Sequence, residues 1–316
     1  MELTTSALLG FRTRYETIFN QAFNVAESTI QKVAFVFNSG RVEQVVHRWL
    51  SGIGMPKEFL DERKIANLMT AGQTITNKLW ENTVGVPRTA LERDQYGVYD
   101  PFIARMGQLA KLHRDSLGYG LLSSMLSDTS IKAYDNIAFY GNHNTGRVTA
   151  AQFNNKSAAA LGALSLQAGI AALRARRDNK GVPLAAAQAR PLLVVPPSLE
   201  FVAAQLATLS FIVGTQPGSG ASSATSQAAQ QENVLKGTFD YIVVPWLATA
   251  TEWHLTLVDP LYKPVILQIE TEPEIMTPPQ YFAEDWAKRD QFVVGSRALH
   301  NVAPGLPEMA YGSTGA

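Results

Sequence analysis

The histidines of this chain are the residue types best suited to bind a metal ion or transfer a proton. The five are His47, His113, His143, His254 and His300. No two of them stand four residues apart, the spacing that places two metal ligands on one face of a helix. The sequence GNHNTG around His143 could suggest nuclease chemistry, but no acidic and histidine partners accompany it, so we interpret His143 as a turn residue. We therefore expect no metal site.

Other motifs for catalysis or cofactor binding are also missing from the sequence. The chain has no cysteine and no Gly-x-Ser-x-Gly elbow beside a strand. The glycines of GTQPGSGAS (214–222) lack the Gly-Lys-Ser/Thr of a P-loop and indicate flexibility instead. Glu270, Glu272 and Glu274 are more typical of a solvated strand end than of an acid and base pair. We predict no catalytic residue, no cofactor and no enzyme.

The charge balance argues against tight binding to nucleic acid. The chain carries 27 basic and 27 acidic side chains, whereas proteins that neutralise phosphates show a basic excess. Arg174, Arg176 and Arg177 are interpreted as the C-terminal cap of a helix rather than as a DNA contact. The sequence contains neither a secretory leader nor a run of about 18 uncharged apolar residues, so we expect no secretion and no membrane span.

The first third of the chain predicts a helix followed by two strands around a long excursion. Apolar residues at spacings of three and four predict an amphipathic helix over 4–30. The run 32–37 predicts a strand that ends at the turn 38–40. Residues 42–50 could form a short helix, and the alternating charges of 57–64 predict an exposed tip. A second strand is expected over 73–86.

This excursion has little core of its own. Loops beyond about 12–15 residues are uncommon in compact domains unless they have a role, and a two-stranded hairpin alone is marginal in water. Some other surface must therefore bury it. The simplest candidate is a neighbouring copy of the same chain.

The rest of the chain predicts a mixture of helices and strands. A long helix is expected from Pro101, with Phe102, Ile103, Met106 and Met125 on one face. A second helix is expected over 157–177, and a strand over 191–196 with Ser198 capping a third helix. The stretch 214–233 is of low complexity and is expected to be a mobile loop. Further strands are expected at 239–247, 253–259, 265–270 and 289–302, the last ordered element before a Pro- and Gly-rich tail.

Residues 33–107 resemble one family, the major head subunit (gpT) of Mu-like phages, which has the Hong Kong 97 capsid fold. The resemblance is in VAFVFNSG, WLSGIGMPKEFLDERKIANL and ITNKLWENTVGVPRTALERDQYGVYDPFIARMGQLA. The matching positions are Asn38, Ser39, Trp49, Leu50, Gly52, Arg63, Ile75, Asn77, Lys78, Trp80, Glu81, Thr83, Val84, Arg88, Asp94, Gly97, Tyr99 and Pro101. Weaker similarity continues in PLLVVPPSLEFVAAQL and KGTFDYIVVPWL.

The resemblance implies an α+β capsid fold with five parts. These are an N-terminal arm (1–32), an extended loop (33–86), a peripheral domain with a long spine helix (87–156), an axial domain (157–288) and a C-terminal return strand with a tail (289–316). It implies that the extended loop lies across the adjacent subunit, and that the stretch 214–233 lies toward the capsomer centre. The residues expected to take part in self-assembly are Phe35, Phe37, Trp49, Arg63, Lys78, Trp80, Glu81 and Arg88.

The resemblance also implies partners and a location. The chain would assemble with many copies of itself, as hexamers and pentamers, into an icosahedral head in the bacterial cytoplasm. The head would enclose double-stranded DNA without reading its sequence, and a portal and possibly a decoration protein would join it. Because the chain begins at a helix with no long charged leader, a separate scaffold protein is expected.

Some positions depart from the family pattern, and two other functions stay open. Many relatives have two adjacent acids where this chain has Glu92-Arg93-Asp94, and proline where it has Asn144. The first alternative is a nanocompartment shell of the same fold that holds an enzyme cargo. The second is a soluble hydrolase with an unrecognised site.

Overall fold

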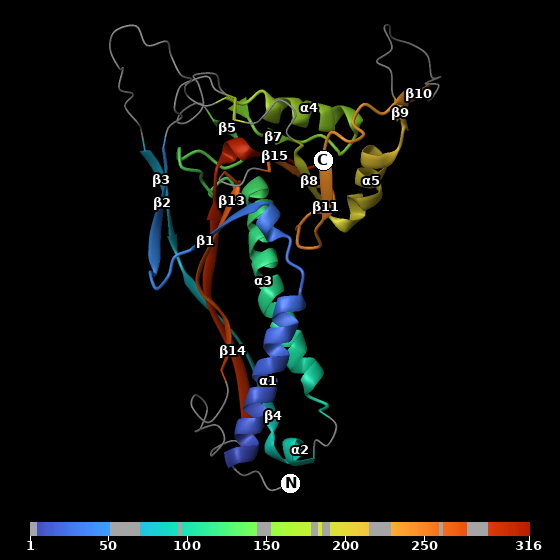
Figure 1. The fold of residues 1–316 in the computed structure, drawn as a ribbon. Coiled ribbons are helices and arrows are strands. Elements are labelled where there is room, and N and C mark those ends of the chain that lie inside the picture. The colour runs from blue at the N-terminus through green and yellow to red at the C-terminus, as the bar shows by residue number, and fades with distance from the viewer. Residues whose placement is uncertain are drawn as a thin grey trace, which may run out of the picture. The chain divides into compact units, whose positions relative to one another are not determined.

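The computed structural model describes residues 5–50, 70–93, 97–143, 153–177, 183–184, 190–214, 229–258, 262–276 and 290–316. The chain divides into two compact units, which are described separately (Figure 1). Unit 1 comprises residues 1–46, 74–118 and 266–303. Unit 2 comprises residues 47–73, 119–265 and 304–316.

Unit 1 is built on a four-stranded sheet in the order β1-β13-β14-β4. The strands are β1 (Ala34–Asn38), β13 (Val265–Met276), β14 (Gln291–Pro304) and β4 (Lys78–Pro87). Strands β14 and β4 pair antiparallel from Gln291 opposite Pro87 to His300 opposite Lys78. The predicted strands at 32–37, 265–270 and 289–302 are thereby confirmed.

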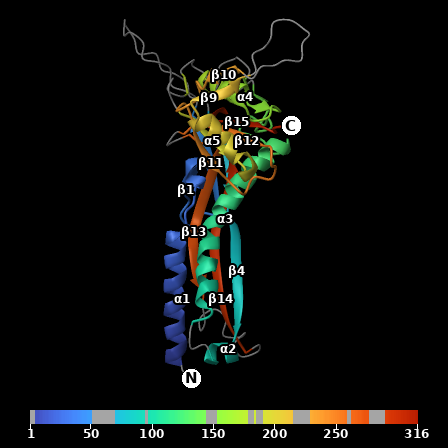
Figure 2. The same ribbon diagram turned by 90° about the vertical axis from the view of Figure 1, so that its right-hand side faces the viewer.

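Two helices pack together in unit 1, and their apolar faces meet the sheet (Figure 2). They are α1 (Thr5–Val25) and the part of α3 (Asp100–Ser127) that belongs to this unit. The core contains Tyr15, Phe19, Val86, Ile103, Met106, Phe292 and Val294. A Cβ at Gly107 would come 2.5 Å from the Phe19 carbonyl oxygen, so glycine is needed where the two helix backbones approach. Arg14 and Asp100 form an ion pair between the helices.

Helix α3 confirms the predicted long helix, with one error of orientation. Ile103, Met106 and Met125 are buried as expected, but Phe102 is 62% exposed. One residue along a helix is a rotation of about 100°, so Phe102 lies outside the stripe that Ile103 and Met106 define. The short helices η1 (Ile30–Lys32) and α2 (Arg88–Arg93) were not predicted.

The hairpin predicted from strands 32–37 and 73–86 is wrong in its pairing, because β1 pairs with β13 and β4 pairs with β14. The two-stranded hairpin lies further along the chain, and its first strand covers residues considered as a possible helix. Strand β2 (Gln44–Leu50) pairs with β3 (Thr70–Thr76) in a two-stranded sheet. The short helix considered for 42–50 is therefore wrong, since Val45 and Val46 are β-branched and favour an extended backbone. The strand predicted over 73–86 is two strands, β3 and β4, separated at Asn77. The predicted tip at 57–64 lies outside the described residues.

Unit 2 is built on a five-stranded sheet in the order β11-β8-β12-β15-β7. Its strands are β7 (Lys156–Ser157), β8 (Leu192–Val195), β11 (Asp240–Val243), β12 (Trp253–Thr256) and β15 (Ala310–Ser313). Strand β8 is fully buried and pairs parallel with β11, as expected for a strand and helix crossover. The helices are α4 (Ala163–Arg174), η2 (Pro197–Leu199), α5 (Glu200–Thr208) and η3 (Pro307–Met309).

Short hairpins complete unit 2. Strand β5 (Asn142–His143) pairs with β6 (Phe153–Asn154), and β9 (Phe211–Gly214) pairs with β10 (Ala229–Glu232). Strand β10 lies inside the stretch predicted as a mobile loop, so that prediction is wrong for 229–232, while 215–228 lie outside the described residues. Among the described residues, no helix is both long and apolar enough to cross a membrane.

Several predictions for unit 2 are corrected by side-chain contacts. Ordered structure does not end at the strand predicted over 289–302. The tail contains β15, which pairs with both β12 and β7. Arg176 caps no helix: it is buried and donates to the carbonyl oxygens of Pro307, Glu308 and Ala310 at 2.6–3.0 Å. Ser198 caps no helix either, because its hydroxyl donates to the Ala250 carbonyl.

Helix α4 is also shorter than predicted and presents a different face. The helical spacing of apolar residues in the predicted helix includes Leu164, but this residue is 68% exposed. The buried residues are Leu166, Gly169, Ile170 and Leu173.

Candidate functional site

The break between β3 and β4 is held by one buried side chain, Asn77. Its Nδ2 donates to Ser39 Oγ at 3.2 Å, to the Val42 carbonyl at 3.0 Å and to Glu270 Oε2 at 3.0 Å. Its Oδ1 accepts from Gln268 Nε2 at 3.0 Å, and Gln268 is fully buried. Strands β1 and β13 and the start of the loop therefore meet at this amide, which fixes where the extended hairpin leaves the sheet.

Next to this amide, Trp80 joins β4 to β14 and α3. Its Nε1 donates to the His300 carbonyl at 2.9 Å, and its ring lies 4.5 Å from that of His113, edge to face. His113 Nδ1 and His300 Nε2 are 3.1 Å apart, so one imidazole donates to the other. Two imidazolium ions would each present a proton at this contact, so at least one of the two rings is neutral.

Burial favours the same neutral state. Desolvation lowers the pKa of His300 to about 3, with smaller contributions from the positive charges of Arg114 and His113. Desolvation also lowers the pKa of His113, and Arg114 adds to the effect. The pair is therefore uncharged near neutral pH and is a structural link.

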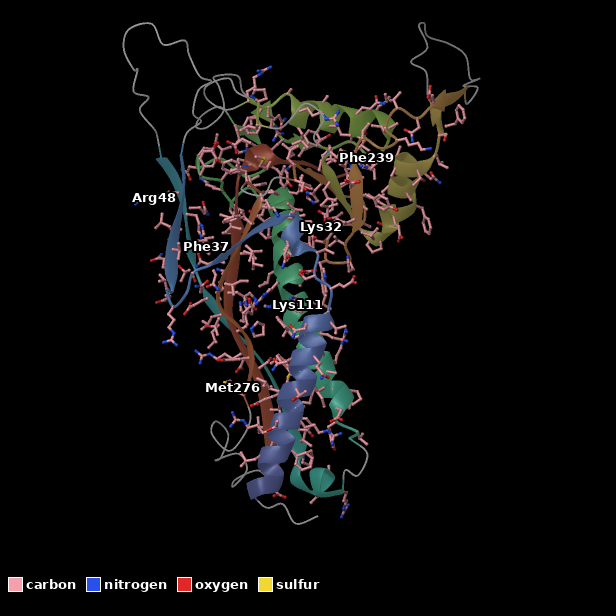
Figure 3. All side chains as sticks on the ribbon, in the orientation of Figure 1. Lys32, Phe37, Arg48, Lys111, Phe239 and Met276 are labelled. Carbon is pink, nitrogen blue, oxygen red and sulfur yellow. The ribbon has the colours of Figure 1, made fainter. Side chains whose placement is uncertain are left out.

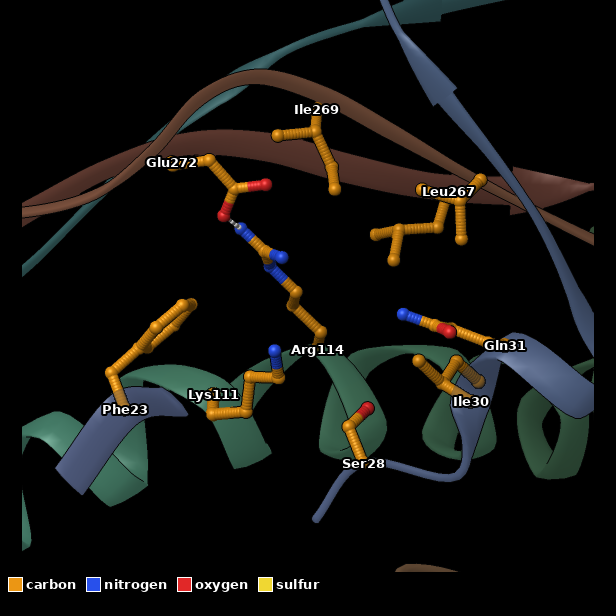
Figure 4. Close-up of a pocket in the computed structure, with 10 residues that line it drawn as sticks. Phe23, Ser28, Ile30, Gln31, Lys111, Arg114, Leu267, Ile269 and Glu272 are labelled. Carbon is orange, nitrogen blue, oxygen red and sulfur yellow. Dashed lines mark hydrogen bonds and ion pairs between the residues drawn. The ribbon is translucent and has the colours of Figure 1, made fainter. Parts of the chain in front are cut away.

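A pocket of about 210 Å³ lies on unit 1 between α1, β1, α3 and β13 (Figure 4). Apolar side chains form much of its wall: Phe23, Ile30, Val36, Leu267 and Ile269. Its charged groups are Lys111, Arg114 and Glu272. Arg114 is 6% exposed, and its Nη2 forms an ion pair with Glu272. Lys111 projects from α3 (Figure 3). Its ammonium lies 4.6 Å from the centre of the Phe23 ring, a cation–π contact (Figure 4).

Of the eight residues expected to take part in assembly, seven lie in described strands or helices. Phe35 and Phe37 are half-buried on β1, Trp80 is half-buried on β4, and Lys78 and Glu81 are exposed on β4. Trp49 lies in β2 and Arg88 begins α2, but their side chains, like all of Arg63, are outside what the structure describes. Of these residues, Lys78, Trp80 and Glu81 come together at the start of β4.

No role was predicted from the sequence for Asn77, His113, His300, Lys111 or Arg114. Asn77 could have been recognised, because it is a polar residue on the same side of the predicted strand as the apolar Ile75. The two histidines carried no such signal, since they come from α3 and β14, 187 positions apart. The glutamates of β13 were interpreted as solvated. Glu272 and Glu274 are exposed as expected, and Glu272 also forms an ion pair with Arg114. Glu270 differs, because it is half-buried and accepts a hydrogen bond from Asn77.

Unit 2 contains buried polar contacts whose residue types resemble those of a catalytic triad. Ser123 Oγ donates to Glu252 Oε1 at 2.7 Å, and Tyr140 Oη lies 3.0 Å from His254 Nδ1. Each of these four side chains is at most 2% exposed, so a substrate has no access to them. His143 is also buried and contacts Asp135 at 2.7 Å, so it is not an exposed turn residue. In the described part of the chain, no three His, Asp or Glu side chains are placed to hold a metal ion.

The fold of the described residues is that of the Hong Kong 97-like phage capsid proteins. Among solved structures, the procapsid of bacteriophage JBD30 matches with a TM-score of 0.56 and 23% identity, over 99% of this chain and 76% of that chain. The predicted α+β capsid fold is confirmed.

Residues 8–158 match the family of the Mu-like prophage major head subunit gpT. The major capsid protein of Escherichia phage Mu is 31% identical over 122 residues, 39% of this chain and 40% of that protein. The FluMu major head subunit of Haemophilus influenzae is 30% identical over 106 residues, 34% of each chain. The matches therefore span less than half the length of these relatives. The resemblance seen in residues 33–107 is confirmed and extends toward both ends.

Proposed function

We propose that this chain is a major capsid protein, many copies of which assemble into the icosahedral head that encloses phage DNA. The observation that carries the proposal is the extended hairpin rooted at Asn77. Strands β2 and β3 form a sheet of two strands in the described chain, and such a pair needs a further surface to be stable. The fold and the match to the head subunit family over residues 8–158 support that surface being another subunit.

Self-assembly accounts for the distribution of exposed residues near the hairpin. Val42, Val46 and Leu79 are 50%, 49% and 58% exposed. Large apolar side chains gathered on one arm indicate a contact surface. Each subunit contact can be modest, because closed symmetry repeats it around a ring and over a shell.

The proposal includes an arrangement of parts. Residues 1–32 would be the N-terminal arm, 33–86 the extended loop, 87–156 the peripheral domain, 157–288 the axial domain and 289–316 the return strand and tail. Hexamers and pentamers would form in the host cytoplasm with a separate scaffold and a portal. The near-neutral chain would confine DNA without binding its sequence, and a decoration protein could join outside.

The test is to express the chain in bacteria, alone and together with a candidate scaffold protein, and to image the purified material by electron microscopy. Closed shells or curved sheets of subunits support the proposal. A monodisperse monomer under both conditions contradicts it, and turnover of a substrate by that monomer would favour the hydrolase. Protein cargo instead of DNA in closed shells would favour the nanocompartment.

A further inference from the structure

The pocket of unit 1 has a charge imbalance that its own residues do not resolve. Lys111 and Arg114 face a single carboxylate, Glu272. Arg114 is only 6% exposed, yet its Nε has no hydrogen-bond partner among the described residues. A buried guanidinium is stabilised when each of its N–H groups, including that of Nε, has a hydrogen-bond acceptor. Figure 4 shows Arg114 reaching from α3 to Glu272 on β13, beside the apolar wall formed by Leu267 and Ile269. The chemistry that fits is a carboxylate beside an apolar group.

The opposite edge of the same sheet carries that combination. Leu79 is 58% exposed on β4, and Glu81 is exposed two residues further on. Residues two apart in a strand point to the same face, so the apolar side chain and the carboxylate lie together. Arg297 stands opposite Glu81 in the β14 register, but within the described chain the two form no ion pair.

Within one subunit these two surfaces cannot meet. The sheet order β1-β13-β14-β4 places the pocket at the β1 and β13 edge and Leu79 at the β4 edge. Strand β14 separates β13 from β4, and each strand spacing is about 4.8 Å. Glu81 therefore lies about 10 Å away along the sheet from the strand that bears Glu272.

We propose that the pocket between α1, β1, α3 and β13 receives Leu79 and Glu81 from the β4 edge of a second copy of this chain. Leu79 contacts the apolar wall, and the Glu81 carboxylate accepts hydrogen bonds from Lys111 and Arg114. This inference rests on the proposed function. Because the two surfaces are different and lie at opposite edges of one sheet, the contact is head-to-tail. A head-to-tail contact closes into a ring when its rotation allows, as a hexamer or pentamer requires.

The test is a charge exchange, measured as the lowest subunit concentration at which shells form. Lys111→Glu and Glu81→Lys should each raise this concentration about tenfold or more, because a desolvated ion pair between proteins commonly contributes at least one factor of ten. The double variant Lys111→Glu with Glu81→Lys should recover most of the loss. Arg105→Glu, on an exposed position of the same helix, is the matched control and should assemble as wild type.

The outcomes separate this inference from the proposed function. If wild type forms shells but neither single variant differs from its control, or if both fail and the exchange does not recover assembly, the pocket contact is refuted while the capsid role stands. If wild type forms no shells under any condition, the capsid role itself fails. Leu79→Asp, which changes an exposed residue and leaves the pocket intact, should also block assembly while circular dichroism stays unchanged. Normal shells from Leu79→Asp would contradict the proposal.

Discussion

Replacing Asn77 with alanine should loosen the root of the extended loop. The substitution removes three hydrogen bonds donated by Nδ2, to Ser39, Val42 and Glu270, and one accepted by Oδ1 from Gln268. Asn77 is 8% exposed and Gln268 is fully buried, with a remaining contact of 3.4 Å to the Ile75 carbonyl. Leaving a buried polar group without its partner costs about 1–3 kcal/mol. Since Glu270 is half-buried and can turn to water, we expect a loss of about 2–4 kcal/mol.

Hydrogen-exchange mass spectrometry can measure this loss locally. At about 1.4 kcal/mol for each factor of ten, peptides from β4 and β14 should exchange roughly 30 to 1,000 times faster in Asn77→Ala than in wild type. The matched control is Asn82→Ala, an exposed position on the same strand, which should change exchange less than threefold, or about 0.6 kcal/mol. Wild-type exchange rates in Asn77→Ala would show that the buried amide does not hold the strands and would refute the reasoning.

Three further perturbations test other links in the structure. Because the pKa of His300 is lowered to about 3 from an unfolded value near 6.5, the unfolded chain binds more protons between these values. The free energy of unfolding should therefore fall as the pH drops below about 6.5. In His300→Gln, urea unfolding at several pH values should show a smaller slope of this free energy against pH, equivalent to up to one proton fewer taken up on unfolding. An unchanged slope would contradict the neutral, buried state of His300. Arg176→Met removes three hydrogen bonds to backbone carbonyl oxygens, of which that of Pro307 keeps Asn155 Nδ2 as a donor. We expect a loss of about 2–5 kcal/mol in urea denaturation, and less than 1 kcal/mol would be too little for the buried tether described. Deleting 310–316 removes β15 from between β12 and β7 and should give aggregated subunit in sedimentation assays; a folded, monodisperse product would show that the sheet does not need this strand.

Regular patterns in the sequence predicted most elements of the fold. The apolar stripe of α1 and the short apolar runs in β8, β13 and β14 identify their own secondary structure. Apolar residues at helical spacing indicate a helix, and a short continuous apolar run indicates a buried strand. The errors fall where pattern and context conflict. Residues 42–50 contain polar residues at a helical spacing, and only pairing with β3 makes them a strand. The final residues contain Pro and Gly, but neighbouring strands on both sides of β15 order them.

The candidate site was less predictable than the fold. Trp80 and Glu81 stood out through the resemblance, but the groups that surround them come from distant segments. His113 and His300 meet only because α3 packs on β14, and Arg114 meets Glu272 only because the same helix crosses β13. No local spacing encodes such contacts. The three arginines near 174–177 illustrate the same limit, because their charge suggested a cap while the backbone of 307–310 required a donor at Arg176.

The role of the extended loop in joining subunits is tested most directly by deleting residues 40–72 and closing the chain with a short glycine and serine linker. The helices α1 and α3 and the sheet of unit 1 lie outside this segment and should keep the subunit folded, as circular dichroism can verify. The measurement is electron microscopy of the purified variant beside wild type under identical assembly conditions. The account predicts shells from wild type and unassembled folded subunit from the deletion. Normal heads from the deletion would contradict it.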